Sequence, residues 1–491
     1  EDTTLGTGTI EFDKDGVNIT LTHLVLDNKE MTYDLALSPA LCLYLVRRNS
    51  EDLEYYFHLV GDCRLTNNFF DEDYNNGGVD FNSWFGCGDD PNKPTIIIDG
   101  DGDLVIWGGS TQLYSDGNIE LDVNLYSVCN NNKYSDGIRC NTLIIDDGVT
   151  ANIVCNGTAI HTEGDLRIMP YTDISIVCGS PHVSVGPTTK GMMFIVGSIF
   201  AEGADITMNG FGDPKNFVPY NAFIATMPGI ILAGEGNVNL DDSDLAIDFT
   251  TIESDQDYAM NFSGIEGYGS SNSVSLTNGS TLSISIDAEE VIGAAGINVP
   301  GIVDLDPDSR LDVNIKARGE TLGIEADRLI RVNDSSVNVN VVSLTEDNTF
   351  GIVCGGAEFN INNKDHTVNI VAQNGVALGA DTGIHGEEAY QPESGYKAEK
   401  IILSGKASII EPKKASINIT AVPGYGEFIR TETVYEGSDV ASAVKIGVRQ
   451  TNVVMYAVLG LLVAGLVTYL VLNSKKNKKE EETADKKNPE S

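Results

Sequence analysis

The sequence predicts an all-β protein: a right-handed parallel β-helix with three short strands in each coil, followed by one C-terminal transmembrane α-helix. Two observations support this prediction. A short motif recurs along the chain at intervals of 23 to 29 residues, and residues 453–472 form an uncharged, strongly apolar run. Outside that run the chain shows almost none of the 3.6-residue periodicity of amphipathic helices.

The recurring motif is a turn residue, often Gly followed by Asp or Asn, and then an apolar–polar–apolar triplet. Its first apolar positions are spaced by 24 and 23 residues and, further along, by 29, 27 and 29 residues; they are Ile119, Leu143 and Leu166, then Val274, Val303, Ile330 and Phe359. Self-similarity at such a period indicates a solenoid, and the larger gaps between these runs predict loop insertions.

Two more short strands are predicted in each repeat. Residues 282–286, 311–315 and 337–341 alternate apolar and polar side chains, and each is followed by a Gly-apolar segment at 296–299, 323–326 or 351–354. Three alternating strands per unit indicate a parallel β-helix, and its crossovers should be right-handed. A β-propeller needs longer repeats, and an immunoglobulin-like sandwich needs hairpin turns that are sparse here.

Four segments follow from this pattern. We expect a β-helix ectodomain over residues 1–394, with an aromatic loop or cap at 67–94, and a β end cap with a juxtamembrane stalk at 395–450. A transmembrane helix at 453–472 and a disordered cytoplasmic tail at 473–491 complete the chain.

The apolar run also predicts where the protein resides. Twenty helical residues span about 30 Å, the thickness of a bilayer's hydrocarbon core. Lys475, Lys476, Lys478 and Lys479 follow at once and mark the cytoplasmic side. We therefore expect a single-pass protein of the cell membrane with its N-terminal part outside. Because the chain begins at Glu1, we expect it to be the processed form of an exported precursor.

The charge balance restricts the partners. The net charge is −41, and the part before residue 473 carries 25 basic and 67 acidic residues, a net charge of −42. Nucleic acid is excluded as a partner, because binding it requires a basic surface. An acidic polymer would need a cation between the two polyanions.

Aromatic residues gather among Asn, Asp and Gly in the predicted loop, where an aromatic ring can cover a sugar face while amides bind hydroxyls. The favoured interpretation is that this loop folds over the first coils as a cap, and a cap could also bind sugar. The candidate carbohydrate-binding residues are Phe69, Phe70, Tyr74, Phe81, Trp84 and Phe85.

Two acidic clusters are candidate calcium ligands: Asp99, Asp101 and Asp103, and Asp304, Asp306 and Asp308. The first resembles the start of a calcium loop but has Leu104 in place of the sixth-position Gly and Ser110 in place of the twelfth-position Glu. A loose Ca²⁺ site therefore stands beside the simpler interpretation that Asp is favoured in turns.

Histidine and cysteine give weaker signals. The six histidines show no metal or catalytic spacing, and we expect His161 and His385 to point outward from their coils. Four of the eight cysteines end strands before Asn or Gly: Cys129, Cys155, Cys178 and Cys354. They fit either a ladder of buried thiols or disulfides between adjacent coils, since neighbouring strands lie within disulfide reach.

The coil motifs at residues 137–145 and 159–168 resemble those of exported carbohydrate-binding β-helix proteins of gut and cellulolytic Gram-positive bacteria, a group related in fold to pectate lyases. The resemblance covers residues 1–430. It implies binding to acidic plant polysaccharide, sometimes with calcium. The motifs of polygalacturonase-like enzymes are matched only by Asp241-Asp242 and, imperfectly, by residues 383–386, so no catalytic residue is assigned.

Three functions remain open at this point. A membrane-anchored glycan-binding adhesin is favoured over a structural or protein-interaction stalk and over a polysaccharide lyase or hydrolase.

Overall fold

A computed structural model describes most of the chain. The described residues are 6–13, 18–28, 41–42, 54–67, 85–87, 95–107, 111–128, 136–155, 157–179, 192–212, 225–251, 258–289, 291–345, 349–381, 401–423, 428–449 and 462–471. They fall into two units, Glu1–Val448 and Arg449–Ser491.

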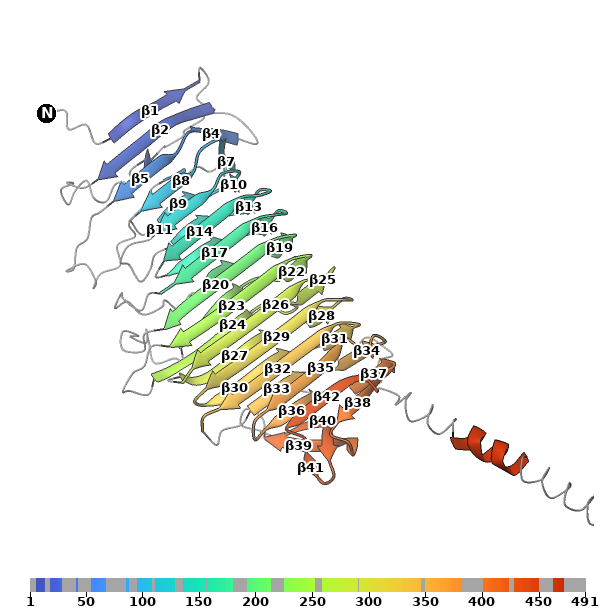
Figure 1. Ribbon diagram of the computed structural model, residues 1–491. Helices are drawn as coiled ribbons and strands as arrows, with labels where there is room; N and C mark the ends of the chain where they lie inside the picture. The colour runs from blue at the N-terminus through green and yellow to red at the C-terminus, as the bar shows by residue number, and fades with distance from the viewer. Residues whose placement is uncertain are drawn as a thin grey trace, which may run out of the picture. The chain divides into compact units, whose positions relative to one another are not determined.

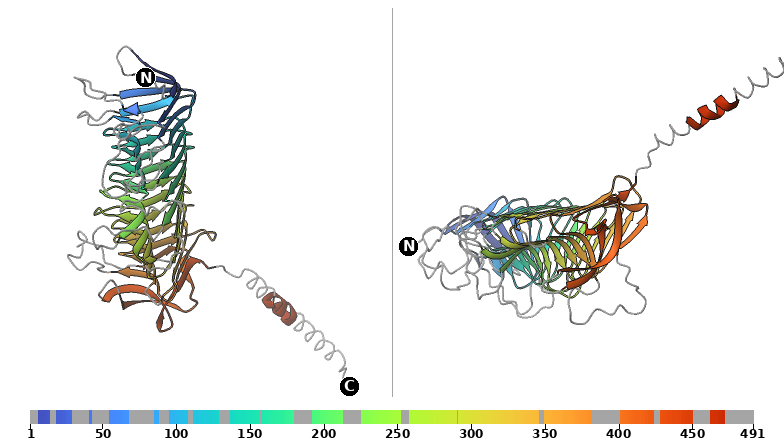
Figure 2. Two further views of the ribbon diagram at one scale, coloured as in Figure 1. Left: turned by 90° about the vertical axis from the view of Figure 1, so that its left-hand side faces the viewer. Right: turned by 90° about the horizontal axis from the view of Figure 1, so that it is seen from below.

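The unit Glu1–Val448 is an all-β solenoid, in which coil after coil adds one strand to each of three parallel ladders in sequence order (Figure 1). Figure 2 shows these coils stacked from the N-terminal strands to the C-terminal ones. The predicted parallel, repeating β architecture is thus confirmed. Its predicted strands 282–286, 311–315 and 337–341 lie within the second ladder.

The first ladder contains β4 (Glu54–Val60), β7 (Thr95–Gly100), β10 (Ile119–Leu121), β13 (Leu143–Ile145), β16 (Leu166–Ile168), β19 (Ile199–Glu202), β22 (Val238–Asp241), β25 (Val274–Thr277), β28 (Ile302–Leu305), β31 (Leu329–Asn333), β34 (Ala357–Ile361) and β37 (Ile401–Gly405). The second contains β5 (Cys63–Asn67), β8 (Leu104–Trp107), β11 (Leu125–Val128), β14 (Thr150–Cys155), β17 (Asp173–Cys178), β20 (Asp205–Gly212), β23 (Asp244–Thr251), β26 (Thr281–Ala288), β29 (Arg310–Ala317), β32 (Ser336–Ser343) and β35 (Thr367–Ala372). The third contains β3 (Leu41–Cys42), β6 (Phe85–Cys87), β9 (Thr111–Ser115), β12 (Asp136–Cys140), β15 (Thr158–Thr162), β18 (Met193–Ile195), β21 (Ala225–Leu232), β24 (Tyr258–Gly267), β27 (Val291–Val299), β30 (Glu320–Ala326), β33 (Thr349–Cys354) and β36 (Val376–Asp381).

Antiparallel strands lie at both ends of the stack. At the start, β1 (Gly6–Phe12) pairs antiparallel with β2 (Asn18–Asn28), and β2 pairs with both β4 and β5, which joins the first two ladders into one sheet. At the other end, β42 (Ala443–Val448) lies antiparallel on β35 and on β38 (Ala407–Glu411). The hairpin of β39 (Ala415–Pro423) and β40 (Phe428–Glu436) continues the third ladder, with β41 (Asp439–Val440) beside it. These strands cover ladder ends that would otherwise expose unpaired edges.

The core is one apolar column inside the coils. Alternation sends every second side chain inward, where residues in register stack on each other; Leu121, Ile145 and Ile168 are one such row. All three are almost completely buried. Fully burying a side chain of this size contributes about 1.5–3 kcal/mol, so each coil is stabilised chiefly by its neighbours.

The recurring Gly-apolar pair of the third ladder has a packing reason. At each such pair both residues face the core, so the strand bends and the glycine lies against its neighbours. A Cβ at Gly323 would lie 2.4 Å from Val339 Cγ1 and 2.3 Å from the carbonyl oxygen of Gly351. Only glycine fits at this bend without displacing the adjoining strand.

The turns between the first and second ladders explain some of the Asp and Asn residues. A residue with positive φ recurs there in successive coils: Tyr171, Gly203, Asp242, Asn278, Asp308 and Asp334. Asp and Asn adopt this backbone conformation more readily than other residues with a side chain. Asp242, Asp308 and Asp334 therefore serve turn formation.

The second unit contains a described helix at residues 462–471, with exposed apolar side chains such as Leu466 and Val467. The predicted transmembrane segment 453–472 lies partly outside the described residues. The described residues contain no helix of the length and apolarity that a membrane span requires.

Candidate functional site

The first predicted calcium cluster does not converge on one point. Asp99 contacts the Nδ1 atom of His58, whereas Asp101 Oδ1 accepts a hydrogen bond from the backbone N–H of Gly61 at 2.8 Å. Asp103 Oδ1 accepts one from Asn124 Nδ2 at 3.0 Å. Each carboxylate thus has its own protein donor and fixes one coil to the next.

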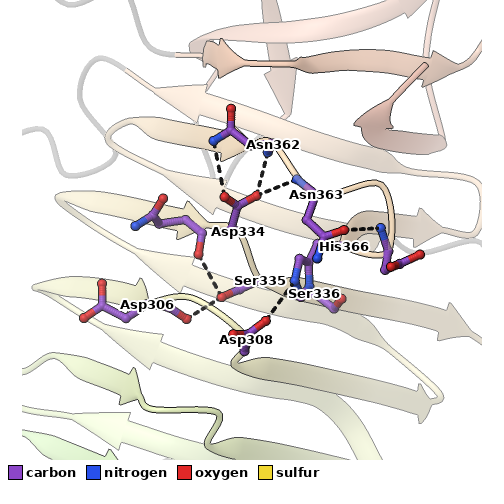
Figure 3. Close-up of polar contacts among 10 residues, drawn as sticks. Asp306, Asp308, Asp334, Ser335, Ser336, Asn362, Asn363 and His366 are labelled. Carbon is purple, nitrogen blue, oxygen red and sulfur yellow. Dashed lines mark hydrogen bonds and ion pairs between the residues drawn. The ribbon is translucent and has the colours of Figure 1, made fainter. Parts of the chain in front are cut away.

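The second cluster is divided in the same way. Asp304 Oδ2 pairs with an Arg331 guanidinium nitrogen at 3.0 Å. Asp306 accepts the Ser335 hydroxyl through its backbone carbonyl, and Asp308 Oδ1 lies 3.2 Å from His366 Nε2 (Figure 3).

No group of three His, Cys, Asp or Glu side chains able to hold a metal occurs within the part of the chain that the structure describes. Calcium binding at these six residues stays a prediction without structural support.

Beside that cluster, Asp334 caps a turn of the next coil. Its Oδ1 accepts hydrogen bonds from the backbone N–H groups of Asn362 at 2.5 Å and Asn363 at 2.9 Å (Figure 3). Burial would raise the pKa of Asp334, but these bonds to the charged form outweigh it and lower that pKa. The acidic side chains at these turns therefore stabilise the turns.

The predicted aromatic loop lies almost wholly outside the described residues. This holds for Phe69, Phe70, Tyr74, Phe81 and Trp84, while Phe85 begins β6 without a described side chain. Their role in carbohydrate binding stays a prediction.

A different aromatic surface is visible on the outer side of the second ladder. Trp107 of β8 and Tyr126 of β11 are 40% and 39% exposed, although both lie in regular strands. Trp107 is in register with Val128, and Val128 with Val154, which is also exposed. These four residues form what we call the aromatic face.

Two amide side chains belong to the strands of the aromatic face or lie next to them. Asn152 is in register with Tyr126. Asn124, just before β11, donates to Asp103 and accepts from the backbone N–H of Thr150 at 2.9 Å. Two exposed charged residues lie on the adjoining strands: Arg64 of β5 is in register with Val105, and Asp173 of β17 is in register with Thr150. In a chain with a net charge of −41, the outward side chains of β8, β11 and β14 are all uncharged.

Sequence reasoning missed this face, although its signal is present. Leu104 and Ile106 are fully buried, so the period of two places Trp107 on the solvent side. The same ladder becomes polar further along, where Ser285, Asn314 and Asn340 occupy the outward positions. The aromatic face is therefore confined to the N-terminal coils.

The outer side of the third ladder carries two perturbed carboxyls. Glu266 is in register with Asn298, and Asn298 with Glu325. Burial, followed by the nearby charges of Asp327, Glu266 and Glu320, raises the pKa of Glu325 to about 7. Burial also raises the pKa of Glu266, against the lowering effect of hydrogen bonds from Ser263 and Tyr268. Successive strands lie about 4.8 Å apart, so the two glutamates are two such steps from each other.

His161 lies earlier on the same ladder. It is in register with Arg139 and Phe194, and only 4% of it is exposed. Its Nδ1 lies 3.6 Å from Asp136 Oδ2 and its Nε2 lies 3.3 Å from Glu163 Oε1. Phe194 packs edge-on against the ring at 4.7 Å. This buried environment was not predictable from alternation.

The described members of the cysteine ladder are buried. Cys155, Cys178 and Cys354 are at most 1% exposed, as is the additional Cys63, and Cys140 is 2% exposed. Burial raises the pKa of the Cys140 thiol. Cys129 lies outside the described residues, as does His385.

Comparison with protein-family models, with curated proteins and with solved structures finds no match to this chain. Function is therefore inferred from the fold and its side chains alone.

Proposed function

We propose that this chain is a membrane-anchored surface protein that binds glycans, and that the aromatic face is one of its contact surfaces. The exposed Trp107 and Tyr126 on neighbouring strands support the proposal most directly. An exposed aromatic ring offers a flat surface for the C–H groups of a sugar, and a nearby amide such as Asn152 can bind hydroxyls.

The charges around this face bear on which glycan binds. The outward side chains of β8, β11 and β14 are uncharged, and the positive charge of Arg64 on the adjoining β5 belongs to a chain that is strongly acidic as a whole. Neutral glycans therefore fit the aromatic face. An acidic plant polysaccharide, which the family resemblance implies, would need calcium as a bridge between two polyanions.

The proposal includes a right-handed winding of the coils, as parallel crossovers almost always have.

The rest of the proposal concerns placement in the cell. Residues 453–472 anchor the chain with the solenoid outside the cell, and the lysines that follow stay in the cytoplasm. The exposed apolar side chains of the helix at 462–471 support membrane contact.

Glycan binding can be tested on an array of neutral and acidic glycans, probed with the full chain in calcium and in chelator. Binding of neutral glycans should persist in chelator, and Trp107→Ala should weaken it about fivefold to tenfold, because stacking contributes about 1 kcal/mol. Phe200→Ala is the matched control, since Phe200 is 43% exposed on the first ladder beside Arg167. Equal loss in both variants would contradict the assignment of this face, and binding of no glycan would favour the stalk.

A hydrolase of β-helix type is a second candidate, favoured by Glu266 and Glu325. Two carboxyls with raised pKa values on one face can act as acid and base, and inverting glycosidases place theirs about 6.5–9.5 Å apart. Release of new reducing ends from a bound glycan, lost in Glu325→Gln, would support this activity over simple binding.

A further inference from the structure

Two cysteines on neighbouring coils stand directly opposite each other. Cys155 ends β14, Cys178 ends β17, and the parallel register pairs the two residues. Their Sγ atoms lie 3.2 Å apart, and each residue is 1% exposed. We propose that these two thiols form a disulfide that links adjacent coils when a disulfide oxidant is present.

The backbone at this point is already suited to a bridge. The N–H of Gly179 donates to the carbonyl oxygen of Cys155 at 2.9 Å, which holds the two strand ends together. Adjacent strands are about 4.8 Å apart, within the 4.4–6.8 Å Cα separation that disulfides span. Oxidation therefore needs rotation of side chains rather than movement of strands.

No other two of the described cysteines are in register. On its other side Cys178 faces Gly210, Cys63 faces Leu104, and Cys354 faces Ala326 and Ala380. Cys140 faces Thr162. Among the described residues, the geometry singles out the 155–178 pair, which divides the predicted cysteine ladder into one bridging pair and several isolated buried thiols.

The chemistry is a thiol–disulfide exchange with glutathione disulfide as the oxidant. One cysteine thiolate attacks a sulfur of glutathione disulfide, breaks its S–S bond and forms a mixed disulfide with release of one glutathione thiolate. The second cysteine thiolate then displaces the other glutathione. The two cysteines lose two electrons and two protons in total, and two glutathione thiols are formed. Because both cysteines are buried, the exchange should be fast during folding and slow afterwards.

The experiment compares the full chain refolded in a glutathione redox buffer with the full chain refolded in excess dithiol. Remaining thiols are alkylated after denaturation, and the peptides are mapped by mass spectrometry without reduction. We expect a linked pair of peptides containing Cys155 and Cys178, lighter by two hydrogen atoms, only in the oxidised sample. The oxidised protein should also melt at a higher temperature, because the bridge restricts the unfolded chain.

Cys178→Ser should abolish both the linked peptide and the rise in melting temperature, whereas Cys354→Ala should leave both intact. The wild-type map decides the question even if a variant fails to fold. Complete alkylation of both cysteines after refolding in the redox buffer would overturn the proposal. A bridge from Cys155 to Cys129, or to any cysteine other than Cys178, would overturn it as well.

Discussion

Replacing Glu325 by glutamine should stabilise the third ladder above about pH 4.5, with the full effect from about pH 7 upward. Glu325 lies on the outer side of β30, partly buried and near the acids Asp327, Glu266 and Glu320. Its pKa is raised from the ordinary 4.5 to about 7, chiefly by burial and then by those charges. The folded state therefore binds the proton of Glu325 more tightly than the unfolded state does.

The sign and size of the effect follow from proton linkage. A carboxyl with a raised pKa favours the folded state below pH 4.5, and this contribution is lost as the pH rises through about 7. Each pH unit corresponds to about 1.4 kcal/mol, so ionised Glu325 costs the folded state about 3 kcal/mol at pH 8. Glutamine keeps the shape of the side chain without the charge. Glu325→Gln should therefore be more stable than the wild type by up to about 3 kcal/mol at pH 8 and nearly equal to it at pH 4.5.

Hydrogen exchange is the suitable assay, because solenoids can unfold coil by coil and a single melting point averages over them. Amides of β27, β30 and β33 should exchange more slowly in Glu325→Gln at pH 8, after correction for the intrinsic pH dependence of exchange. Glu202→Gln is the control, since Glu202 is exposed at the end of β19. An equal difference at both pH values, or faster exchange at pH 8, would refute the reasoning.

Two further substitutions test the packing and the turns. Gly323→Val should destabilise the coils around β30 by several kcal/mol, because the added side chain meets Val339 and the Gly351 carbonyl. Chemical denaturation should show this loss of stability. The control Ser283→Ala, at an outward-facing position, should change the stability little. Asp334→Ala should cost about 1–3 kcal/mol by leaving two backbone N–H groups without their acceptor. The amide hydrogens of Asn362 and Asn363 should exchange faster at pH 7 in this variant. An unchanged exchange rate would show that Asp334 does not stabilise the turn.

The repeat made the fold predictable because the alternation of apolar and polar residues shows directly which side chains are buried. The apolar residues Leu311, Val313 and Ile315 of β29 recur with a period of two, and all three are buried in the core. The Gly-apolar pairs predicted the third ladder for a different reason, since only glycine fits the bend at Gly323. Both signals are local, so they can be recognised without knowing the partner strand.

The outer faces were less predictable, because alternation states which side chains point outward and not what surrounds them. His161 and Trp107 occupy outward positions, yet the first is 4% exposed and the second 40%. The acids are a second example. Asp306 and Asp308 look like a ligand cluster in sequence, whereas a turn with positive φ at Asp308 sends their polar groups to different partners. The aromatic loop around Trp84 lies outside the described residues, so its candidate role is still a prediction.

A carboxylate that destabilises the folded state at neutral pH needs an explanation, and for Glu325 two explanations can be distinguished by experiment. If its raised pKa only reflects crowding on an acidic surface, Glu325→Gln should gain stability at pH 8 and bind glycans as the wild type does. If Glu325 serves as an acid or base beside Glu266, the same variant should gain stability and lose release of reducing ends while retaining binding. Stabilised variants that lose activity are the usual sign of a functional residue. Measuring stability, binding and hydrolysis on this one variant therefore distinguishes a glycan-binding face from a glycan-cleaving one.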